Sequence, residues 1–360
     1  MKRLLKQCIC LAAATVLVLT SASPQNVNAT PQNVNAAPQN VNAAPQNEIV
    51  GAYNYGYKNS PLDKNGKLTL KGTNIVNKKG KKIQLKGSSI CGVTWFPEMI
   101  DRDIFKIYRD EWKANVIRLS MYVDTSMYGP QSGCEGYASA NSKERTNILE
   151  LMYKGIDEAT RLGMYVIVDW HVLDEHDPNK YIKQSKDFFK KISKKYADND
   201  NILYEICNEP NGGDVTWSRI KKYANQVIPV IRKNNSDAII IVGTPTWCQD
   251  LSSPKSSPIK GYSNIMYSCH FYAKSHTDYN RSEMVSAIKS GLPVFVSEYG
   301  FTDYSGAGDV DYEQAGKWIK VMNKYNVSSC FWGVKSKSDL TGNKMSKYCK
   351  YVKKYISSKN

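Results

Sequence analysis

Short apolar runs alternate with longer amphipathic stretches along most of this chain. The runs are rich in Val, Ile and Tyr, a composition typical of buried β-strands. They cover residues 83–90, 116–121, 165–170, 202–207, 238–242, 265–272, 294–297 and 329–334. The stretches between them carry apolar residues at helical spacing and cover residues 103–113, 142–162, 183–196, 218–232, 283–289, 313–325 and 344–356. The pattern predicts strands and helices in alternation.

Near-continuous apolar strands that alternate with helices predict a parallel sheet covered on both faces. Eight such strands favour a closed (β/α)8 TIM barrel over an open sheet. An open nucleotide-binding sheet would favour a glycine-rich phosphate loop, and the sequence has neither G-x-G-x-x-G nor a P-loop. Ahead of the first strand, residues 73–87 alternate around Lys79-Gly80, which predicts an N-terminal β-hairpin.

The N-terminal segment has a different pattern. It begins with a basic stretch, Met1-Lys2-Arg3, continues with an apolar run at 8–19 and then has small residues typical of a cleavage site. This pattern predicts a secretory signal peptide over residues 1–23. That run is too short for a membrane span, which needs about 20 apolar residues, and no later segment is apolar enough. Residues 24–56 repeat the unit PQNVNAA, whose regular prolines predict a disordered linker. We therefore expect a catalytic domain over residues 57–360. We also expect the protein to be secreted, either released or retained at the cell surface.

Charge and cysteine content limit the kinds of partner and cofactor that we expect. The net charge is +16, but the lysines are spread along the chain without a nucleic-acid motif, so we expect no nucleic-acid partner. Seven cysteines lie beyond the leader without any C-x-x-C pair, so neither a metal site nor a cofactor is predicted. We expect a monomer.

Two apolar runs lead into glutamates. Glu209 follows the run at 202–207, and Glu298 follows the run at 294–297. A carboxylate next to a buried strand costs free energy unless it is paired or used. In a TIM barrel the C-terminal ends of the strands form the active site. Two carboxylates facing one cleft there are the acid and nucleophile of a glycoside hydrolase.

Other polar and aromatic residues fall at the same ends of the predicted strands. Flat indole rings stack on the apolar faces of sugars, so three tryptophans at one barrel end favour a polysaccharide cleft. The candidates beside the glutamates are Arg118, His171, Asn208, His270 and Tyr272, with Trp95, Trp247 and Trp332.

These segments resemble glycoside hydrolase family 5, in its bacterial endo-β-1,4-glucanase branch. The resemblance runs from about residue 60 to the C-terminus. It rests on Val-Ile-Arg118-Leu, Val-Asp-Trp-His171, Tyr-Glu-Ile-Cys-Asn208-Glu209-Pro-Asn-Gly, Ser-Cys-His270-Phe-Tyr272 and Phe-Val-Ser-Glu298-Tyr-Gly, all in the family's order. It implies a secreted, metal-independent, retaining enzyme that cuts internal β-1,4 bonds of cellulose and related β-glucans by double displacement.

The resemblance also implies a role for each matching residue. Glu209 matches the acid/base, Glu298 the nucleophile, and Asn208 the residue that binds the sugar 2-hydroxyl. The remaining matches are partners of the nucleophile (Arg118, Tyr272), the lining of the cleavage subsite (His171, His270), stacking platforms (Trp332, Trp95, Trp247) and a polar pair for the next sugar (Lys337, Asp339).

The chain departs from the family pattern at two positions. Cys91 stands where a histidine is usual, and Gly333 where relatives often carry Asn. Both departures predict weakened or shifted sugar binding with retained chemistry. A mixed-linkage glucanase, mannanase or xylanase specificity and a non-catalytic glucan-binding derivative remain the alternatives.

Overall fold

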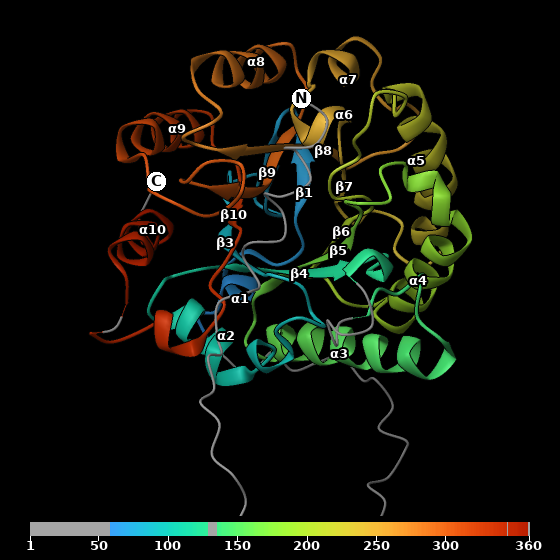
Figure 1. Ribbon diagram of the computed structural model, residues 1–360, viewed down its shortest axis with the longest axis horizontal. Coiled ribbons are helices and arrows are strands. Elements are labelled where there is room, and N and C mark those ends of the chain that lie inside the picture. Colours follow the sequence, from blue (N-terminus) through green and yellow to red (C-terminus); the bar gives the residue numbers. More distant parts are fainter. Residues whose placement is uncertain (1–57, 129–134, 344, 359–360) are drawn as a thin grey trace, which may run out of the picture. The chain divides into compact units, whose positions relative to one another are not determined.

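The computed structural model describes residues 58–128, 135–343 and 345–358. Eight parallel strands close into a barrel in the order β10-β3-β4-β5-β6-β7-β8-β9, and helices surround it (Figure 1). The strands are β3 (Lys86–Ile90), β4 (Val116–Tyr122), β5 (Tyr165–His171), β6 (Ile202–Glu205), β7 (Ile240–Val242), β8 (Ile265–Tyr272), β9 (Val294–Gly300) and β10 (Ser329–Phe331). The predicted (β/α)8 barrel is therefore confirmed. The predicted leader (1–23) and linker (24–56) lie outside the described residues.

The main helices lie close to the predicted ranges. They are α2 (Arg102–Asp110), α3 (Ser142–Arg161), α4 (Ile182–Lys195), α5 (Trp217–Arg232), α8 (Asp278–Lys289), α9 (Tyr312–Lys324) and α10 (Lys347–Ser357). Local capping explains several of their starts. Asn141 begins α3 with a capping box, in which its side chain accepts from backbone N–H groups while Glu144 bonds back to the Asn141 N–H. Short helices α6 (Pro245–Cys248) and α7 (Ser252–Ser256) were not predicted.

The strands are mostly apolar because both of their faces are buried. All seven residues of β5 and all seven of β9 are buried. One apolar core fills the barrel interior with side chains such as Val116, Ile167, Leu203 and Phe295. The larger core lies between the strands and the surrounding helices. The parallel arrangement places the C-terminal ends of all eight strands at one mouth.

An N-terminal hairpin is present, but its position differs from the prediction. Strands β1 (Thr69–Lys71) and β2 (Asn74–Val76) pair around a two-residue turn at Gly72. At the predicted turn, Lys79-Gly80, only an isolated bridge joins Val76 to Lys82. There the Asn77 side chain accepts the N–H groups of residues 79 and 81, so these donors do not join a ladder.

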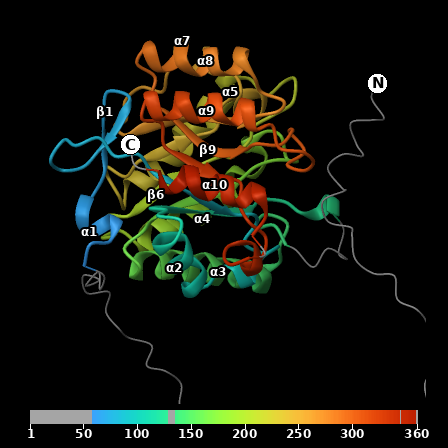
Figure 2. The same cartoon turned by 90° about the vertical axis from the view of Figure 1, so that its left-hand side faces the viewer.

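The hairpin and α1 (Pro61–Asn65) lie together at one end of the barrel (Figure 2). The Thr69 hydroxyl and the Leu70 N–H both donate to Asn264, which precedes β8. This contact places the hairpin at the N-terminal end of the strands, opposite the mouth that carries the candidate site.

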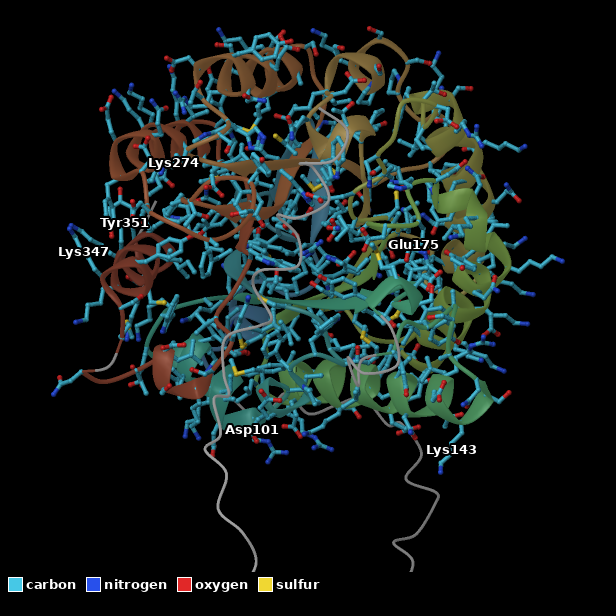
Figure 3. The ribbon with its side chains drawn as sticks, in the orientation of Figure 1. Asp101, Lys143, Glu175, Lys274, Lys347 and Tyr351 are labelled. Carbon is cyan, nitrogen blue, oxygen red and sulfur yellow. The ribbon has the colours of Figure 1, made fainter. Side chains whose placement is uncertain are left out.

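Exposed lysines project from the outer helices, as Figure 3 shows for Lys143 of α3 and Lys347 of α10. The positive charge is therefore distributed over the surface. In the described part of the chain, no helix has both the length and the apolarity that crossing a bilayer requires.

Candidate active site

The two glutamates face each other at the C-terminal mouth. Glu298 lies within β9, which continues to Gly300, and Glu209 lies beyond β6, which ends at Glu205. Glu298 is buried and Glu209 is half-buried. One carboxylate oxygen of each lies within 4.8 Å of the other. The structure thus brings the predicted pair together, although neither residue is the last one of its strand.

Glu298 is held by two donors. The Arg118 Nη1 donates to its Oε2 at 3.2 Å, and the Tyr272 hydroxyl donates to its Oε1 at 2.8 Å. Arg118 comes from β4, and Tyr272 is the last residue of β8, which pairs with β9. Burial, followed by the nearby Glu298 charge, raises the pKa of Tyr272 well above its ordinary value, so its hydroxyl remains a donor. Both oxygens of Glu298 are therefore fixed in position.

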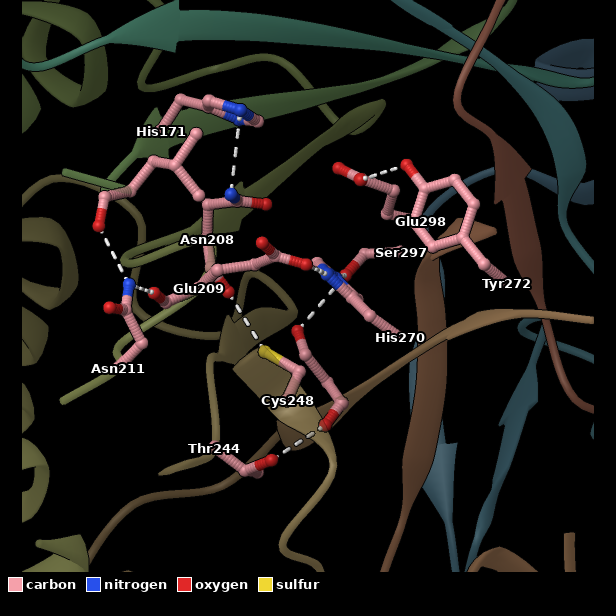
Figure 4. Close-up of polar contacts among 12 residues, drawn as sticks. His171, Asn208, Glu209, Asn211, Thr244, Cys248, His270, Tyr272, Ser297 and Glu298 are labelled. Carbon is pink, nitrogen blue, oxygen red and sulfur yellow. Dashed lines mark hydrogen bonds and ion pairs between the residues drawn. The ribbon is translucent and has the colours of Figure 1, made fainter. Parts of the chain in front are cut away.

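Glu209 has a different environment. Its Oε1 lies 2.8 Å from Nδ1 of His270, whose Nε2 lies 2.9 Å from the Ser297 hydroxyl (Figure 4). The Ser297 hydroxyl in turn donates to Oε1 of Glu205 at 2.6 Å. Burial alone would lower the pKa of His270, but the carboxylates of Glu205 and Glu209 raise it to about 9. The two glutamates of the pair thus differ in their hydrogen-bond partners and in burial.

Arg118 is fully buried and contacts several acidic and polar groups. Its Nε donates to Glu205 at 2.7 Å and its Nη2 to Oδ1 of Asn208 at 2.6 Å, while Nη2 also lies 3.0 Å from Asp169. Burial alone would raise the pKa of Glu205, but Arg118 and then His270 lower it to about 2. Sequence reasoning overlooked Glu205, although a charge inside the apolar run at 202–207 is itself a signal.

His171 is neutral, and its tautomer follows from its neighbours. Burial and then the Arg118 charge lower its pKa to about 3. Its Nδ1 lies 2.7 Å from Asp169, so the neutral ring donates there, and Nε2 accepts from the Asn208 amide at 3.4 Å. Because Arg118 occupies Oδ1 of Asn208, the orientation of that amide is fixed.

Aromatic rings cover the same mouth. The Trp332 indole stacks on His171 with centroids 5.2 Å apart and planes 10° apart. Trp332 follows β10, rather than lying within the strand as predicted. The Tyr122 ring lies 4.4 Å from His171 and 6.0 Å from Trp95. Tyr122 was missed because the predicted strand stopped one residue before it.

The remaining predicted residues are Trp247, Lys337 and Asp339. Trp247 is 41% exposed, and its backbone N–H donates to the Pro210 carbonyl. Lys337 and Asp339 lie in a short 3-10 helix after β10, where Asp339 accepts from the Ser336 hydroxyl. Their role as a polar pair for the next sugar stays a prediction.

Glu209, His270 and Glu298 are the described residues whose ligand atoms come close enough for a cation. Those atoms already make hydrogen bonds: Glu209 contacts His270, and Glu298 accepts from Arg118 and Tyr272. A cationic His270 and a buried guanidinium beside the cluster oppose a metal ion. The geometry suits proton transfer and nucleophilic attack instead.

A TIM barrel with two facing carboxylates at its mouth has the architecture of a glycoside hydrolase. The profile for "Cellulase (glycosyl hydrolase family 5)" matches residues 76–338. The chain belongs to this family.

Two curated relatives are Endoglucanase A of Butyrivibrio fibrisolvens and Endoglucanase of Clostridium saccharobutylicum. The first is 43% identical over 275 residues, covering 76% of this chain and 61% of that protein. The second is 39% identical over 291 residues, covering 81% and 62%. The match thus spans less than two thirds of each relative's length.

Solved structures agree with the fold. The structure "Cellulase Cel5C_n" has a TM-score of 0.77 and 36% identity, covering 84% of this chain and 95% of that one. The catalytic domain of Thermobifida fusca endoglucanase Cel5A has a TM-score of 0.75 and 33% identity, covering 83% and 100%. A variant of that endoglucanase was solved in complex with cellotetraose.

Proposed function

We propose that this protein is a secreted, retaining endo-β-1,4-glucanase that cuts internal bonds of cellulose and related β-glucans. The observation that carries the proposal is the approach of the Glu209 and Glu298 carboxylates to within 4.8 Å. Retaining enzymes hold their two carboxyl groups about 5–5.5 Å apart, whereas inverting enzymes leave about 6.5–9.5 Å for a water. The leader-like N-terminal pattern supports secretion.

The first step is glycosylation of the enzyme. Glu298, held by Arg118 and Tyr272, attacks the anomeric carbon while the bond to the leaving oxygen breaks. Glu209 transfers its proton to that oxygen, and the shortened glucan leaves. The carboxylate that remains on Glu209 is stabilised by the charged imidazole of His270, 2.8 Å away.

The second step releases the sugar. Glu209, now a base, takes a proton from a water that attacks the anomeric carbon, and the ester to Glu298 breaks. Two inversions at one carbon restore the β-configuration. Asn208, fixed by Arg118 and His171, is positioned to bind the 2-hydroxyl in both steps.

A polymeric glucan fits the aromatic surface better than a small sugar does. Trp95, Tyr122 and Trp332 form a group beside His171, and Trp247 lies exposed beside Pro210. The names of the relatives, all endoglucanases or cellulases, favour β-1,4-glucan over mannan and xylan.

Product release from cellohexaose tests the proposal. The wild type should produce shorter oligosaccharides, and Glu298→Ala should abolish them. Glu313→Ala should not, because the side chain of this glutamate is 77% exposed and pairs with Lys317 on the surface. Initial rates on carboxymethylcellulose, lichenan, mannan and xylan should rank the two glucans first. Absence of product from every substrate would contradict the proposal.

A further inference from the structure

Two buried cysteines contact backbone carbonyls of cleft residues. The Cys91 thiol donates to the carbonyl of Trp332 at 2.6 Å, and the Cys248 thiol donates to the carbonyl of Asn208 at 2.8 Å. Both cysteines are free and buried. In the described part of the chain, the thiols of Cys269 and Cys330 are also buried, but neither donates to such a carbonyl. The two contacts lie on opposite sides of the cleft, one beside the Trp332 platform and one beside Glu209.

On the Trp332 side, the backbone is closely enclosed. Gly333 has φ +117°, and a Cβ there would lie 2.2 Å from the carbonyl oxygen of Ser89 and 2.8 Å from the sulfur of Cys91. This position therefore admits only glycine. The two departures from the family pattern, Cys91 and Gly333, therefore pack against each other next to the Trp332 backbone.

On the Glu209 side, the backbone is strained. Thr246, Trp247 and Cys248 all have positive φ, at 57°, 53° and 60°. A left-handed conformation costs about 1–2 kcal/mol for each non-glycine residue, so surrounding contacts must maintain it. The turn is joined to the segment after β6 twice, by the Trp247 N–H to Pro210 and by the Cys248 thiol to Asn208 (Figure 4).

We propose that Cys91 and Cys248 are positioning residues that act as hydrogen-bond clamps, Cys91 on the Trp332 platform and Cys248 on the segment that carries Asn208 and Glu209. Both thiols are suited to the task because they stay protonated. Burial raises the pKa of Cys91 to about 12, and burial raises that of Cys248 well above its ordinary value. They are therefore protonated donors at neutral pH, and poor nucleophiles.

The two clamps have different kinetic consequences, an expectation that rests on the proposed glucanase function. Loss of one neutral hydrogen bond changes an equilibrium about 3- to 10-fold. Cys91→Ala should raise KM for cellohexaose by that factor and leave kcat within about twofold, since Trp332 is a binding platform. Cys248→Ala should lower kcat by that factor with little change in KM, since it displaces the acid/base. Cys91→Ser and Cys248→Ser should stay near wild type, because a shorter C–O bond places a hydroxyl at ordinary O–H···O distance.

Hydrogen exchange tests the clamps without relying on activity. The Trp332 N–H bonds to Tyr299, and the N–H groups of Asn208 and Glu209 bond to Trp170 and Val172. Cys91→Ala should speed exchange in a peptide spanning 329–335, and Cys248→Ala in one spanning 206–212. Cys269→Ala, which removes a buried thiol from β8 and lies outside both peptides, should change neither.

The outcomes separate the two proposals. If the wild type lacks glucanase activity, the proposed function fails, and the exchange data alone decide the clamps. If both Ala variants match Cys269→Ala in exchange and kinetics, the clamps do not exist. Faster hydrogen exchange of the matching peptide in each Ala variant, together with wild-type exchange in the corresponding Ser variant, would confirm the clamps.

Discussion

Ser297 is the residue that connects the charge of Glu205, through His270, to the proposed acid/base Glu209. Its hydroxyl lies between the Glu205 carboxylate and Nε2 of His270, and the other nitrogen of that ring faces Glu209. Ser268 donates to the same Glu205 oxygen at 3.3 Å and lies 3.0 Å from the Ser297 hydroxyl, but it makes no hydrogen bond to His270 in the described structure. The two serines therefore form a matched pair.

Ser297→Ala should move the alkaline limb of the pH profile of kcat/KM to lower pH. The neighbouring carboxylates raise the pKa of His270 to about 9, so His270 keeps its proton up to that pH. Weakening the link to Glu205 lowers this pKa, and the proton shared with Glu209 is lost sooner as pH rises. The expected shift is about 0.5–1 pH unit.

Ser268→Ala is the control, measured over the same pH range. It should leave the alkaline limb in place, because in the described structure the hydrogen bond to the imidazole comes from Ser297 and not from Ser268. Equal shifts in both variants would contradict a role specific to Ser297.

The sequence predicted some residues of the candidate site and missed others. The acids at the predicted strand ends were found because a charge beside a buried run is conspicuous. Glu205 and Ser297 were missed because their importance depends on Arg118 and His270, which come from other strands. Only the closed barrel brings these residues into contact.

At the scale of elements, two helical glycines have opposite surroundings. Gly155 lies in α3, where an added Cβ would approach the two methyl groups of Leu119 to 2.7 Å and 2.9 Å. Gly316 lies in α9, where the nearest atom to an added Cβ is the Tyr351 hydroxyl at 3.8 Å. The sequence alone does not distinguish these positions.

Gly155→Ala should lower the free energy of unfolding by about 1–3 kcal/mol, because the buried Leu119 has to move. Gly316→Ala should raise it by about 0.5–1 kcal/mol, because alanine loses less backbone entropy in a helix. Urea unfolding of both variants checks the pair. A stabilised Gly155→Ala would show that the α3–β4 contact is looser than described.

Elements were predicted well where periodicity was strong. The run at 265–272 agrees with β8 at both ends, and most helices begin within one residue of the predicted start. The hairpin was misplaced because two glycine turns, at Gly72 and Gly80, follow each other closely, and side-chain contacts of Asn77 decide which one is paired. The left-handed turn at 246–248 had no signal, since non-glycine residues there are stabilised only by tertiary contacts.

At the scale of the whole molecule, one buried carboxyl opposes stability at high pH. Glu175, in the loop after β5, is 6% exposed and accepts the Leu173 N–H at 2.8 Å. Burial raises its pKa to about 7 from an ordinary 4.5. Since the folded state holds this proton more tightly than the unfolded state, stability falls as pH rises from about 4.5 to 7.

Glu175→Gln removes this dependence, because glutamine resembles the protonated carboxyl. The variant should be more stable than the wild type at pH 8 and close to it at pH 5, as measured by urea unfolding at both pH values. Glu313→Gln on the surface should be neutral at both. A Glu175→Gln variant that is equally destabilised at both pH values would contradict this account.

In the proposed mechanism, Glu209 and Glu298, brought within 4.8 Å at the barrel mouth, act on one bond. Trapping the covalent intermediate with a 2-fluoro cellobioside that carries a good leaving group tests this most directly. The account predicts inactivation with one fluorosugar attached to Glu298, identified in the peptide by mass spectrometry. An enzyme that hydrolyses glucan but carries the label on another residue, or never carries it, would contradict the assignment of Glu298 as nucleophile.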